Sequence, residues 1–533
     1  MLPTSSPCVR ACTPSAPSRP CSRVRARGAW SVRTDPPAVR DRPRRLVERV
    51  IRVGSRLARR LPGAIGGRGT YFSAQQRLTA DPHRADWPRD VETLLALADR
   101  DLARGRTDAS LRWYDKALRI SFDPSLHQAG GSPLAADPET FLEPLRSSET
   151  GALMLGAPVP AASVPVRPAP RERGGKRTRL LVIAQENWTF IRPVLDALRG
   201  TGRFEVREIE VDDLAGPGFP DRERILRGRY DLVVSGRRMP TPPEMAEAYD
   251  WADVALVEWS HHVLTWVTLL DRAPRKLMAR LHRFEAFTPF PLLHDHARID
   301  RMLYVSPPVW NLLRSAVPAF ADVEGVQVGN LLARGLGPTP GPDRDRHLLV
   351  QVGWLREVKD VLFSLEVLAR LRTHDPRYRL RLIGPGLPAA SSADGAYRRR
   401  VRRRLEELGP EAVQQLGRRD DVPALLAGSG VILSSSRHEG THESVMEGLA
   451  AGCPAVIRDW PDAADYGGPG TLYDSGWVVA DVQAAVQRVL ELSVPERYAE
   501  ESHRARRFAL AHRDPEILVA AYERALTEDS AAA

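Results

Sequence analysis

The sequence predicts an α/β protein with two Rossmann-like, doubly wound domains that face a cleft, preceded by a basic tail and a small helical segment. The chain has 533 residues, which is too long for a single hydrophobic core. From residue 177 onward, short apolar runs alternate with helix-compatible segments, and a Gly/Pro-rich break at 335–342 divides them into two series. Buried parallel strands joined by helices produce this pattern.

The amino-terminal tail, residues 1–70, carries the excess of positive charge. It contains 16 arginines, no lysine and three acids, a net charge of +13, so the rest of the chain carries −3 of the overall +10. A nearly neutral body argues against nucleic acid as a partner. The tail lacks the apolar segment of a secretory signal, although its composition superficially resembles an organellar transit peptide. Cys453 is the only cysteine outside the tail, which favours a reducing cytoplasm.

Within the tail, residues 42–61 predict a basic amphipathic helix. Such a helix could lie on an anionic membrane surface, which would make the protein cytoplasmic but peripheral to the membrane. It could equally dock on the body with its arginines in water. The sequence leaves both alternatives open.

Residues 85–128 predict two helices joined at Gly105. The stretch resembles one tetratricopeptide repeat, because its small and large residues fall where such a repeat places them (Leu97, Gly105, Tyr114, Ala117 and Leu118). One repeat cannot bury its own face, so we expect it to pack on a neighbouring part of the chain. Residues 129–176 are rich in Pro, Ala and Ser and predict a linker.

The strands of the first domain, 177–338, are predicted from apolar runs at 177–185, 204–211, 230–236, 253–259, 276–282 and 301–306. Those of the second domain, 345–495, are predicted at 347–353, 378–384, 430–436, 453–458 and 476–479. Helices over 496–528 are expected to cross back to the first domain. Ligands of such sheets bind at the carboxyl ends of the strands, so the loops there are the place to look for chemistry.

The second half of the chain carries four stretches that resemble one family of enzymes. They are VGWLREVKD, RLRLIGPG, LGRRDDVPALLAGSGVILSSSRHEG and HESVMEGLAAGCPAVIRD, within residues 345–470. Together they resemble glycosyltransferase family 4, which has the GT-B fold and retains the anomeric configuration. The resemblance implies a nucleotide-diphosphate sugar as donor, a glycan or lipid-linked acceptor hydroxyl, and neither a covalently bound cofactor nor a required metal.

The strongest of these elements is E-x7-E, formed by Glu439 and Glu447. A strand ends before it, a turn follows, and a helix begins near Glu443, whose first amides have no partner within the helix and can bind a diphosphate. A carboxylate accepts hydrogen bonds from hydroxyls but repels phosphate. We therefore expect Glu439 to hold the donor sugar and Glu447 the ribose, while Glu443 interacts with the helix dipole. The turn residues Gly440, Thr441 and His442 are expected at the donor. The alternative is that Glu447 lies on a solvated helix face and that Glu439 is an ordinary turn residue.

The diphosphate also needs fixed cations, because negative charge develops on it as it leaves. Lys359 matches the family position for one cation, and Arg356 is a nearby substitute for the other. The family places Arg directly after the glycine Gly353, but this chain has Trp354 there, and Asp360 stands where the family has Gly. These departures leave open an inactive GT-B-like protein that binds glycan or protein through the helical segment. Gly384 is expected near the nucleotide base, with residues 417–422.

The first domain is expected to hold the acceptor. His282 ends a predicted strand, and the resemblance places a histidine near the donor sugar there; the alternative is a histidine of the core. Glu258, His261 and His262, at the end of another predicted strand, are further candidates for acceptor contact. The loop after the first strand lacks the glycines that this family often has there, so we do not expect its backbone to approach the phosphates closely, and Asn187 or Trp188 is expected to serve differently.

A metal site is not expected. Asp343 and Asp345 form a D-x-D in a connecting loop, and the motif of His294 and His296 lacks ligands at helical spacing. The sequence therefore predicts a retaining hexosyltransferase whose catalytic groups are His282, Glu439, Lys359 and Arg356.

Overall fold

The computed structural model describes residues 63–82, 85–128, 131–169, 177–216, 219–332, 344–390 and 395–528. Two six-stranded sheets, each with all of its strands parallel, confirm the predicted α/β fold class with two doubly wound domains. The predicted helix over 42–61 lies outside the described residues. Among the helices within these ranges, none is both long and apolar enough to cross a bilayer.

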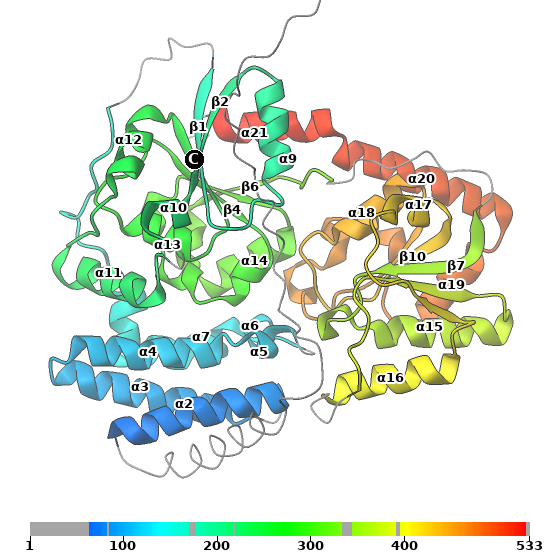
Figure 1. Ribbon diagram of the computed structural model, residues 1–533, viewed down its shortest axis with the longest axis horizontal. Helices are drawn as coiled ribbons and strands as arrows, with labels where there is room; N and C mark the ends of the chain where they lie inside the picture. Colours follow the sequence, from blue (N-terminus) through cyan, green and yellow to red (C-terminus); the bar gives the residue numbers. More distant parts are fainter. Residues whose placement is uncertain are drawn as a thin grey trace, which may run out of the picture. The chain divides into compact units, whose positions relative to one another are not determined.

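The first sheet has the strand order β2-β1-β3-β4-β5-β6 (Figure 1). Its strands are β1 Thr178–Ala184, β2 Phe204–Glu210, β3 Val254–Glu258, β4 Leu277–Leu281, β5 Arg301–Tyr304 and β6 Glu324–Gln327. The helices between them are α9 Arg192–Gly200, α10 Val211–Ala215, α11 Arg222–Ser235, α12 Pro243–Trp251, α13 His262–Leu269 and α14 Pro307–Ala316. The central strands β3 and β4 are buried along their whole length, as strands covered on both faces must be.

The second sheet has the order β12-β11-β10-β7-β8-β9. Its strands are β7 Asp345–Val352, β8 Arg379–Ile383, β9 Val413–Gln415, β10 Ser429–Ser434, β11 Ala455–Arg458 and β12 Val478–Val479. Its helices are α15 Val361–His374, α16 Ala396–Leu408, α17 Val422–Ala427, α18 Glu443–Ala450, α19 Val482–Glu491 and α20 Pro495–Arg513. Read from β9, this is the 3-2-1-4-5-6 order of dinucleotide-binding sheets.

The strand order locates the binding edge of each sheet. In each sheet the first strand along the chain is an interior strand, and the strands that follow are added first on one side of it and then on the other. The order reverses between β1 and β3 in the first sheet and between β7 and β10 in the second. Ligands of doubly wound sheets bind outside the carboxyl ends of the strands at this reversal. The loops after β1, β3, β7 and β10 are therefore the positions from which side chains can act on a ligand.

The last two helices pack on different sheets. Helix α20 contacts α18 of the second sheet, and α21 Pro515–Thr527 contacts α9 of the first (Figure 1). Tyr522 and Leu526 of α21 are fully buried in one apolar cluster with Leu180 of β1. The carboxyl-terminal end of the described chain thus completes the core of the first sheet.

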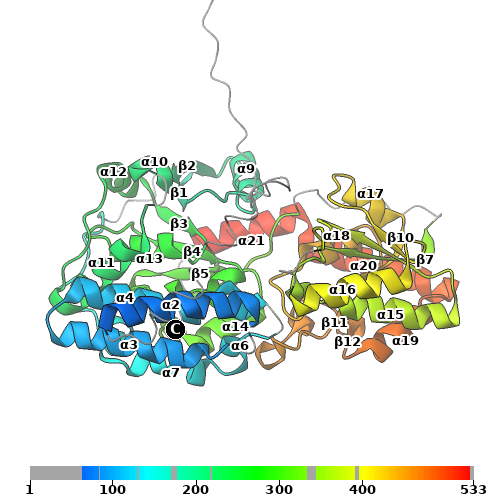
Figure 2. The same cartoon turned by 60° about the horizontal axis from the view of Figure 1, so that its bottom comes forward.

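The helical segment comprises α2 Gly63–Ala80, α3 Trp87–Ala103, α4 Thr107–Ser121 and α5 Pro124–Gln128. Helices α2, α3 and α4 lie side by side in Figures 1 and 2, and α4 also contacts α11 of the first sheet. Gly105 joins α3 to α4 with φ +69°. Tyr114, Ala117 and Leu118 are buried, so the pair packs on a neighbour as expected. Its identity as a tetratricopeptide unit stays a prediction.

The strand predicted at 230–236 is wrong, because these residues end helix α11. The helix has both of its usual end signals: the Asp221 side chain accepts a hydrogen bond from the Arg224 amide, and Gly236 follows with φ +70°. A short apolar run is compatible with a strand or with a buried helix, and here Leu232 and Val233 are buried as part of a helix.

The predicted linker is also wrong over 133–156, and the predicted tail is wrong over 63–70, where α2 begins. The linker region contains α6 Pro133–Ala136, α7 Pro138–Ser147, α8 Glu149–Gly151 and a π-helical turn, Ala152–Gly156. Ser132, Asp137 and Ser148 each cap one of these helices with their side chains. A proline at the first helical position is compatible with a helix, so composition alone misled the prediction.

Strand β10 lies close against β7 at Gly430, where the register of the ladder shifts. A Cβ at Gly430 would lie 2.6 Å from the Arg346 Cα and from the Asp345 carbonyl oxygen. We expect Gly430→Ala to lower the free energy of unfolding by about 1–3 kcal/mol, since backbone cannot give way. Gly200→Ala is the control, because open space surrounds Gly200 at the end of α9. Equal urea midpoints for wild type and Gly430→Ala would contradict this close approach.

Candidate active site

The loops after β7 and β10 are fastened to each other by buried hydrogen bonds. Gln351 Nε2 donates to Ser435 Oγ at 3.0 Å, and Ser435 Oγ donates to the carbonyl oxygen of Lys359 at 2.6 Å. The Arg437 amide donates to the Val358 carbonyl oxygen at 2.9 Å. These bonds place Lys359 and the residues that follow β10 at one site, at the reversal point of the second sheet.

Lys359 and Glu439 form an ion pair at this site. Lys359 Nζ lies 2.5 Å from Glu439 Oε1, which also accepts a hydrogen bond from Ser436 Oγ at 2.5 Å. Glu439 is only 9% exposed. Burial by itself would raise the pKa of Glu439, but the charges of Lys359 and Arg283 hold that pKa well below its usual range. Glu439 is therefore an ionised carboxylate beside a cation.

Helix α18 begins directly after this ion pair. His442 precedes it with φ +42°, a left-handed conformation that is uncommon for a residue with a side chain. Its Nδ1 atom lies 2.8 Å from Ser434 Oγ, and burial lowers the pKa of His442 to about 4, so the ring is neutral at pH 7. The buried Thr441 carbonyl oxygen accepts a bond from the Tyr473 hydroxyl. The turn 440–442 is thereby held at the amino-terminal end of α18, where helix amides favour an anion.

The remaining predicted donor residues lie on α18 and on the loops after β7 and β8. Glu447 is half-buried one turn into α18. Gly353 and Gly384 have positive φ angles, and a Cβ at Gly384 would lie 3.6 Å from the Gly353 Cα, so the two loops pack backbone to backbone. A Cβ at Gly353 would lie 3.8 Å from Lys359 Cε. Arg356 is exposed on the same loop.

In the first sheet, His282 follows β4 and is 6% exposed. Its Nε2 atom lies 3.0 Å from Glu258 Oε1, and its ring lies 4.2 Å from the ring of Trp259. Burial would raise the pKa of Glu258, but the charge of Arg280, 3.0 Å away, keeps that pKa low. His282 is thus held by an ionised carboxylate.

The other first-sheet candidates make mainly structural contacts. The Asn187 carbonyl oxygen accepts a bond from Trp259 Nε1, and Trp188 Nε1 donates to Glu210. His261 and His262 contact each other through their Nδ1 atoms and are largely buried, and burial lowers the pKa of His262 to about 4. The structure brings Glu258 and His282 together and sets these other side chains around them.

Two contacts join the first-sheet residues to the α18 turn. Asn330 Nδ2 donates to Glu443 Oε1 at 2.9 Å, and its Oδ1 accepts from Arg280. Arg283 Nη1 donates to His438 Nδ1 at 2.8 Å. Sequence reasoning missed Arg280, although a charged residue inside the buried run LMARL was a signal that it has a buried partner. Asn330 and His438 carried no comparable signal.

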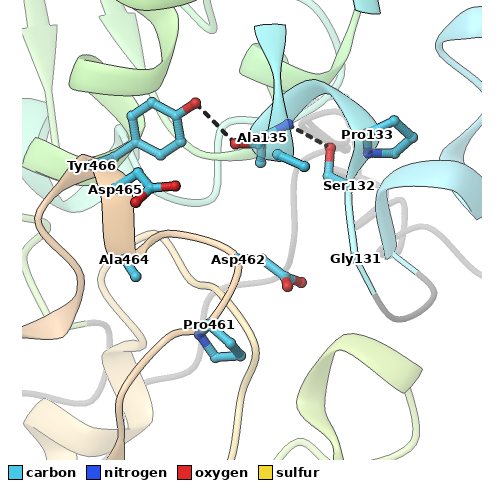
Figure 3. A pocket seen from close by; sticks show the side chains of 10 residues that line it. Gly131, Ser132, Pro133, Ala135, Pro461, Asp462, Ala464, Asp465 and Tyr466 are labelled. Atoms are coloured by element: carbon cyan, nitrogen blue, oxygen red, sulfur yellow. Dashed lines mark hydrogen bonds between the residues drawn. The ribbon is translucent and has the colours of Figure 1, made fainter.

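A cavity of about 490 Å³ lies beside this site, between α6 and the segment after β11 (Figure 3). Figure 3 shows Tyr466, whose hydroxyl donates to the Ala135 carbonyl oxygen at 2.9 Å. Asp462 and Asp465 also line the cavity. None of the predicted donor residues lines it, and its two carboxylates are unsuited to a diphosphate.

A family comparison applies to the second sheet. The family model described as Glycosyl transferases group 1 matches residues 346–493. The match runs from β7 to α19 and so covers the second sheet. Lys359, Glu439 and Glu447 all lie inside the match. Glycosyltransferase 1 domain-containing protein 1 of Xenopus tropicalis is 29% identical over 116 residues, which are 22% of this chain and 32% of the relative. The chain therefore aligns with about a third of that relative.

Solved structures with similar architecture cover more of the chain at low identity. An O-GlcNAc transferase mutant of Thermobaculum terrenum is 18% identical, with a TM-score of 0.47, over 86% of this chain and 89% of its own. Sucrose-phosphate synthase of Thermosynechococcus elongatus is 16% identical, with a TM-score of 0.47, over 65% and 98%. TarM is 13% identical, with a TM-score of 0.42, over 52% of this chain and 55% of its own.

The described residues considered from the sequence as metal ligands have other partners in the structure. Asp345 pairs with Arg379 at 2.6 Å, and His294 is buried between Ser260 and Thr265. Asp343 lies outside the described residues. Within the described ranges, no group of three or more His, Cys, Asp or Glu is placed to hold a metal ion.

The low pKa of Glu439 predicts a pH-dependent contribution to stability. A carboxyl whose pKa is depressed by folding stabilises the protein above its unfolded pKa of about 4.3, and this contribution is lost as the pH falls toward the folded value. We expect Glu439→Gln to cost about 1–3 kcal/mol at pH 7, because Lys359 loses its partner. The difference from wild type should shrink below about pH 4.3.

Urea unfolding of both proteins between pH 7 and pH 3 measures this difference. Glu366→Gln is the matched control, since Glu366 is 40% exposed and pairs with Arg370 and Arg404 on the surface. Its cost should stay below about 1 kcal/mol. A pH-independent cost for Glu439→Gln would show that ionisation of Glu439 does not contribute.

Proposed function

We propose that the chain is a retaining glycosyltransferase that moves a hexosyl group from a nucleotide-diphosphate sugar to an acceptor hydroxyl. The observation that carries this proposal is the buried Lys359–Glu439 ion pair at the start of α18, inside the segment that matches the glycosyltransferase family. A cation and a carboxylate side by side fit a ligand that presents both phosphate and hydroxyl groups.

Donor binding exchanges the partners of this ion pair. Lys359 turns from Glu439 to the diphosphate, which the first amides of α18 also hold. Glu439 is then available to accept hydrogen bonds from the hydroxyls of the donor sugar, and Glu447 from those of the ribose. Gly353 and Gly384 give the nucleotide close access to backbone. Lys359, Gly353, Gly384 and Glu439 belong to the loops after β7, β8 and β10, and Glu447 belongs to α18.

In the transfer step, the bond between the sugar C1 and the diphosphate oxygen breaks, and a bond from C1 to the acceptor oxygen forms on the same face. The acceptor proton passes to the leaving diphosphate oxygen. Lys359 stabilises the negative charge that develops on the diphosphate, and mutation of such a group typically costs several kcal/mol of barrier. His282, held by Glu258, orients the sugar or the acceptor. This scheme needs neither a metal nor a covalently bound cofactor.

The acceptor is proposed to be a glycan or a lipid-linked glycan of the cell envelope. A cytoplasmic location at an anionic membrane surface, through residues 42–61, stays a prediction from the sequence. The rival function is an inactive GT-B-like protein that binds glycan or protein through its helical segment, and the same experiment separates the two.

Wild-type protein incubated with a panel of UDP- and GDP-sugars should release nucleoside diphosphate slowly by transfer to water and faster with an acceptor. Lys359→Met should lower the rate by about 10²–10³-fold, because the charge on the leaving group loses its partner. Glu447→Ala should weaken nucleotide binding. Mass spectrometry of the nucleotide product measures release, and Arg497→Met, at an exposed arginine of α20, is the control.

Failure of every nucleoside diphosphate to raise the unfolding temperature at millimolar concentration would reject the enzyme and favour the binding protein. Release that is equal in wild type and in Lys359→Met would reject the role of Lys359.

A further inference from the structure

The donor site of the second sheet lacks one cation. A diphosphate carries at least two negative charges, and Lys359 is the one cation that matches the family position. The residue after Gly353, where the resemblance expects arginine, is Trp354, which is 1% exposed and packs in the core of the second sheet. Arg356 lies further along the loop and is exposed. A cation directly after Gly353 is therefore missing, and no buried cation of the described loop takes its place.

Arg283 of the first sheet lies at this place. It directly follows His282, and a Cβ at Gly440 would lie 3.5 Å from the Arg283 Cβ, so the arginine stands against the turn that precedes α18. Its Nη1 atom donates to His438 at 2.8 Å. The charge of Arg283 is among those that lower the pKa of Glu439. Burial lowers the pKa of Arg283 itself; the charge of Glu439 opposes this shift, and the charge of Arg356 adds to it.

We propose that Arg283, which follows β4 of the first sheet, supplies the second cation of the donor diphosphate site of the second sheet. This inference rests on the proposed function. A guanidinium presents five N–H groups in a planar fork that suits phosphate oxygens, and the bond to His438 occupies only part of that fork. Arg283 and Lys359 would then bind the diphosphate from two different loops, those after β4 and β7.

The balance of charge at the turn points to an anion. The positive charges of Lys359 and Arg283 act on Glu439, and the positive charge of Arg356 acts on Arg283. The ionised Glu439 is already paired with Lys359. The other acid that acts on Arg283 is Glu285, whose pKa is raised by burial, which weakens it as a counter-charge. Buried positive charge without a full counter-charge is costly. An anionic ligand removes that cost.

The helical segment fixes the position of Arg283 through His438. Burial and the neighbouring Arg283 charge hold the pKa of His438 well below its usual range, so its ring is neutral. Arg283 Nη1 lies 2.8 Å from His438 Nδ1 and 3.2 Å from Nε2, and Nε2 lies 3.2 Å from the His127 carbonyl oxygen of α5. The tautomer that fits these contacts has Nδ1 as acceptor from Arg283 and Nε2–H as donor to His127. His127 is itself buried, with Nδ1 2.8 Å from Ser132 Oγ. His438 is thus a positioning residue, and α5 is its support.

Isothermal titration of UDP, GDP and ADP into wild type, Arg283→Gln, Arg283→Lys and Arg497→Gln tests the inference. For the nucleoside diphosphate that wild type binds most tightly, Arg283→Gln should weaken binding by about 10- to 100-fold, as expected for a charged hydrogen-bonding partner. Arg283→Lys should recover part of the loss, and Arg497→Gln should match wild type. Affinity for the corresponding nucleoside, measured by ligand-observed NMR, should not change. The salt dependence of diphosphate binding should also be weaker in Arg283→Gln.

The outcomes separate this inference from the function on which it rests. If wild type binds none of the diphosphates, the proposed function fails and the role of Arg283 fails with it. If wild type binds and Arg283→Gln binds equally well, only the role of Arg283 is wrong. If Arg283→Gln unfolds at a lower temperature than wild type without ligand, the Arg283→Lys variant is used to decide. Weaker diphosphate binding by Arg283→Lys with unchanged nucleoside binding supports the inference. Unchanged binding of both ligands by Arg283→Lys overturns it.

Discussion

The ion pair between Lys359 and Glu439 is the interaction on which the candidate site depends. Two opposite charges in contact are favourable, but both lose water when they are buried, so the pair is stable only because neighbouring groups hold its geometry. The hydrogen bonds from Gln351 and Ser435 fix the Lys359 loop, and Ser436 fixes the glutamate. A ligand that offers phosphate to the lysine and hydroxyls to the glutamate can replace the pair without leaving either charge unpaired.

The first sheet contributes to the same site from the other half of the chain. Glu258 holds His282, Arg280 holds Glu258, and Asn330 connects Arg280 to Glu443 at the start of α18. This network is buried, so the loss of any member would leave a polar group unsatisfied. Helix α20 packs on the second sheet, and α21, which follows it along the chain, packs on the first. The chain therefore crosses between the two sheets a second time.

The helical segment has a role at the site that its sequence did not indicate. Residues that resemble a repeat unit suggested binding of a partner or of a glycan. In the structure, α5 touches the loop after β10 through the His127 carbonyl oxygen, and the Ala135 carbonyl oxygen of α6 accepts a bond from Tyr466. Both contacts link parts of the chain separated by more than 300 residues.

The sequence predicted the parts of the structure that depend on local pattern. Apolar runs located β1, β4, β7, β8 and β10, and the E-x7-E spacing located α18, because a strand, a turn and a helix each leave a local signature. The run at 230–236 failed because seven apolar-rich residues fit a strand or a buried helix equally well, and the caps Asp221 and Gly236 were needed to decide. Arg283, His438 and Asn330 could not be predicted, since their partners are brought together only by the tertiary fold.

The most direct test of the donor site is a crystal structure of the protein with the nucleoside diphosphate that binds it. The expected result is a diphosphate in contact with Lys359 Nζ and with the first amides of α18, with the ribose on Glu447 and the Lys359–Glu439 ion pair opened. A nucleotide bound elsewhere, with that ion pair intact, would contradict the assignment of the site.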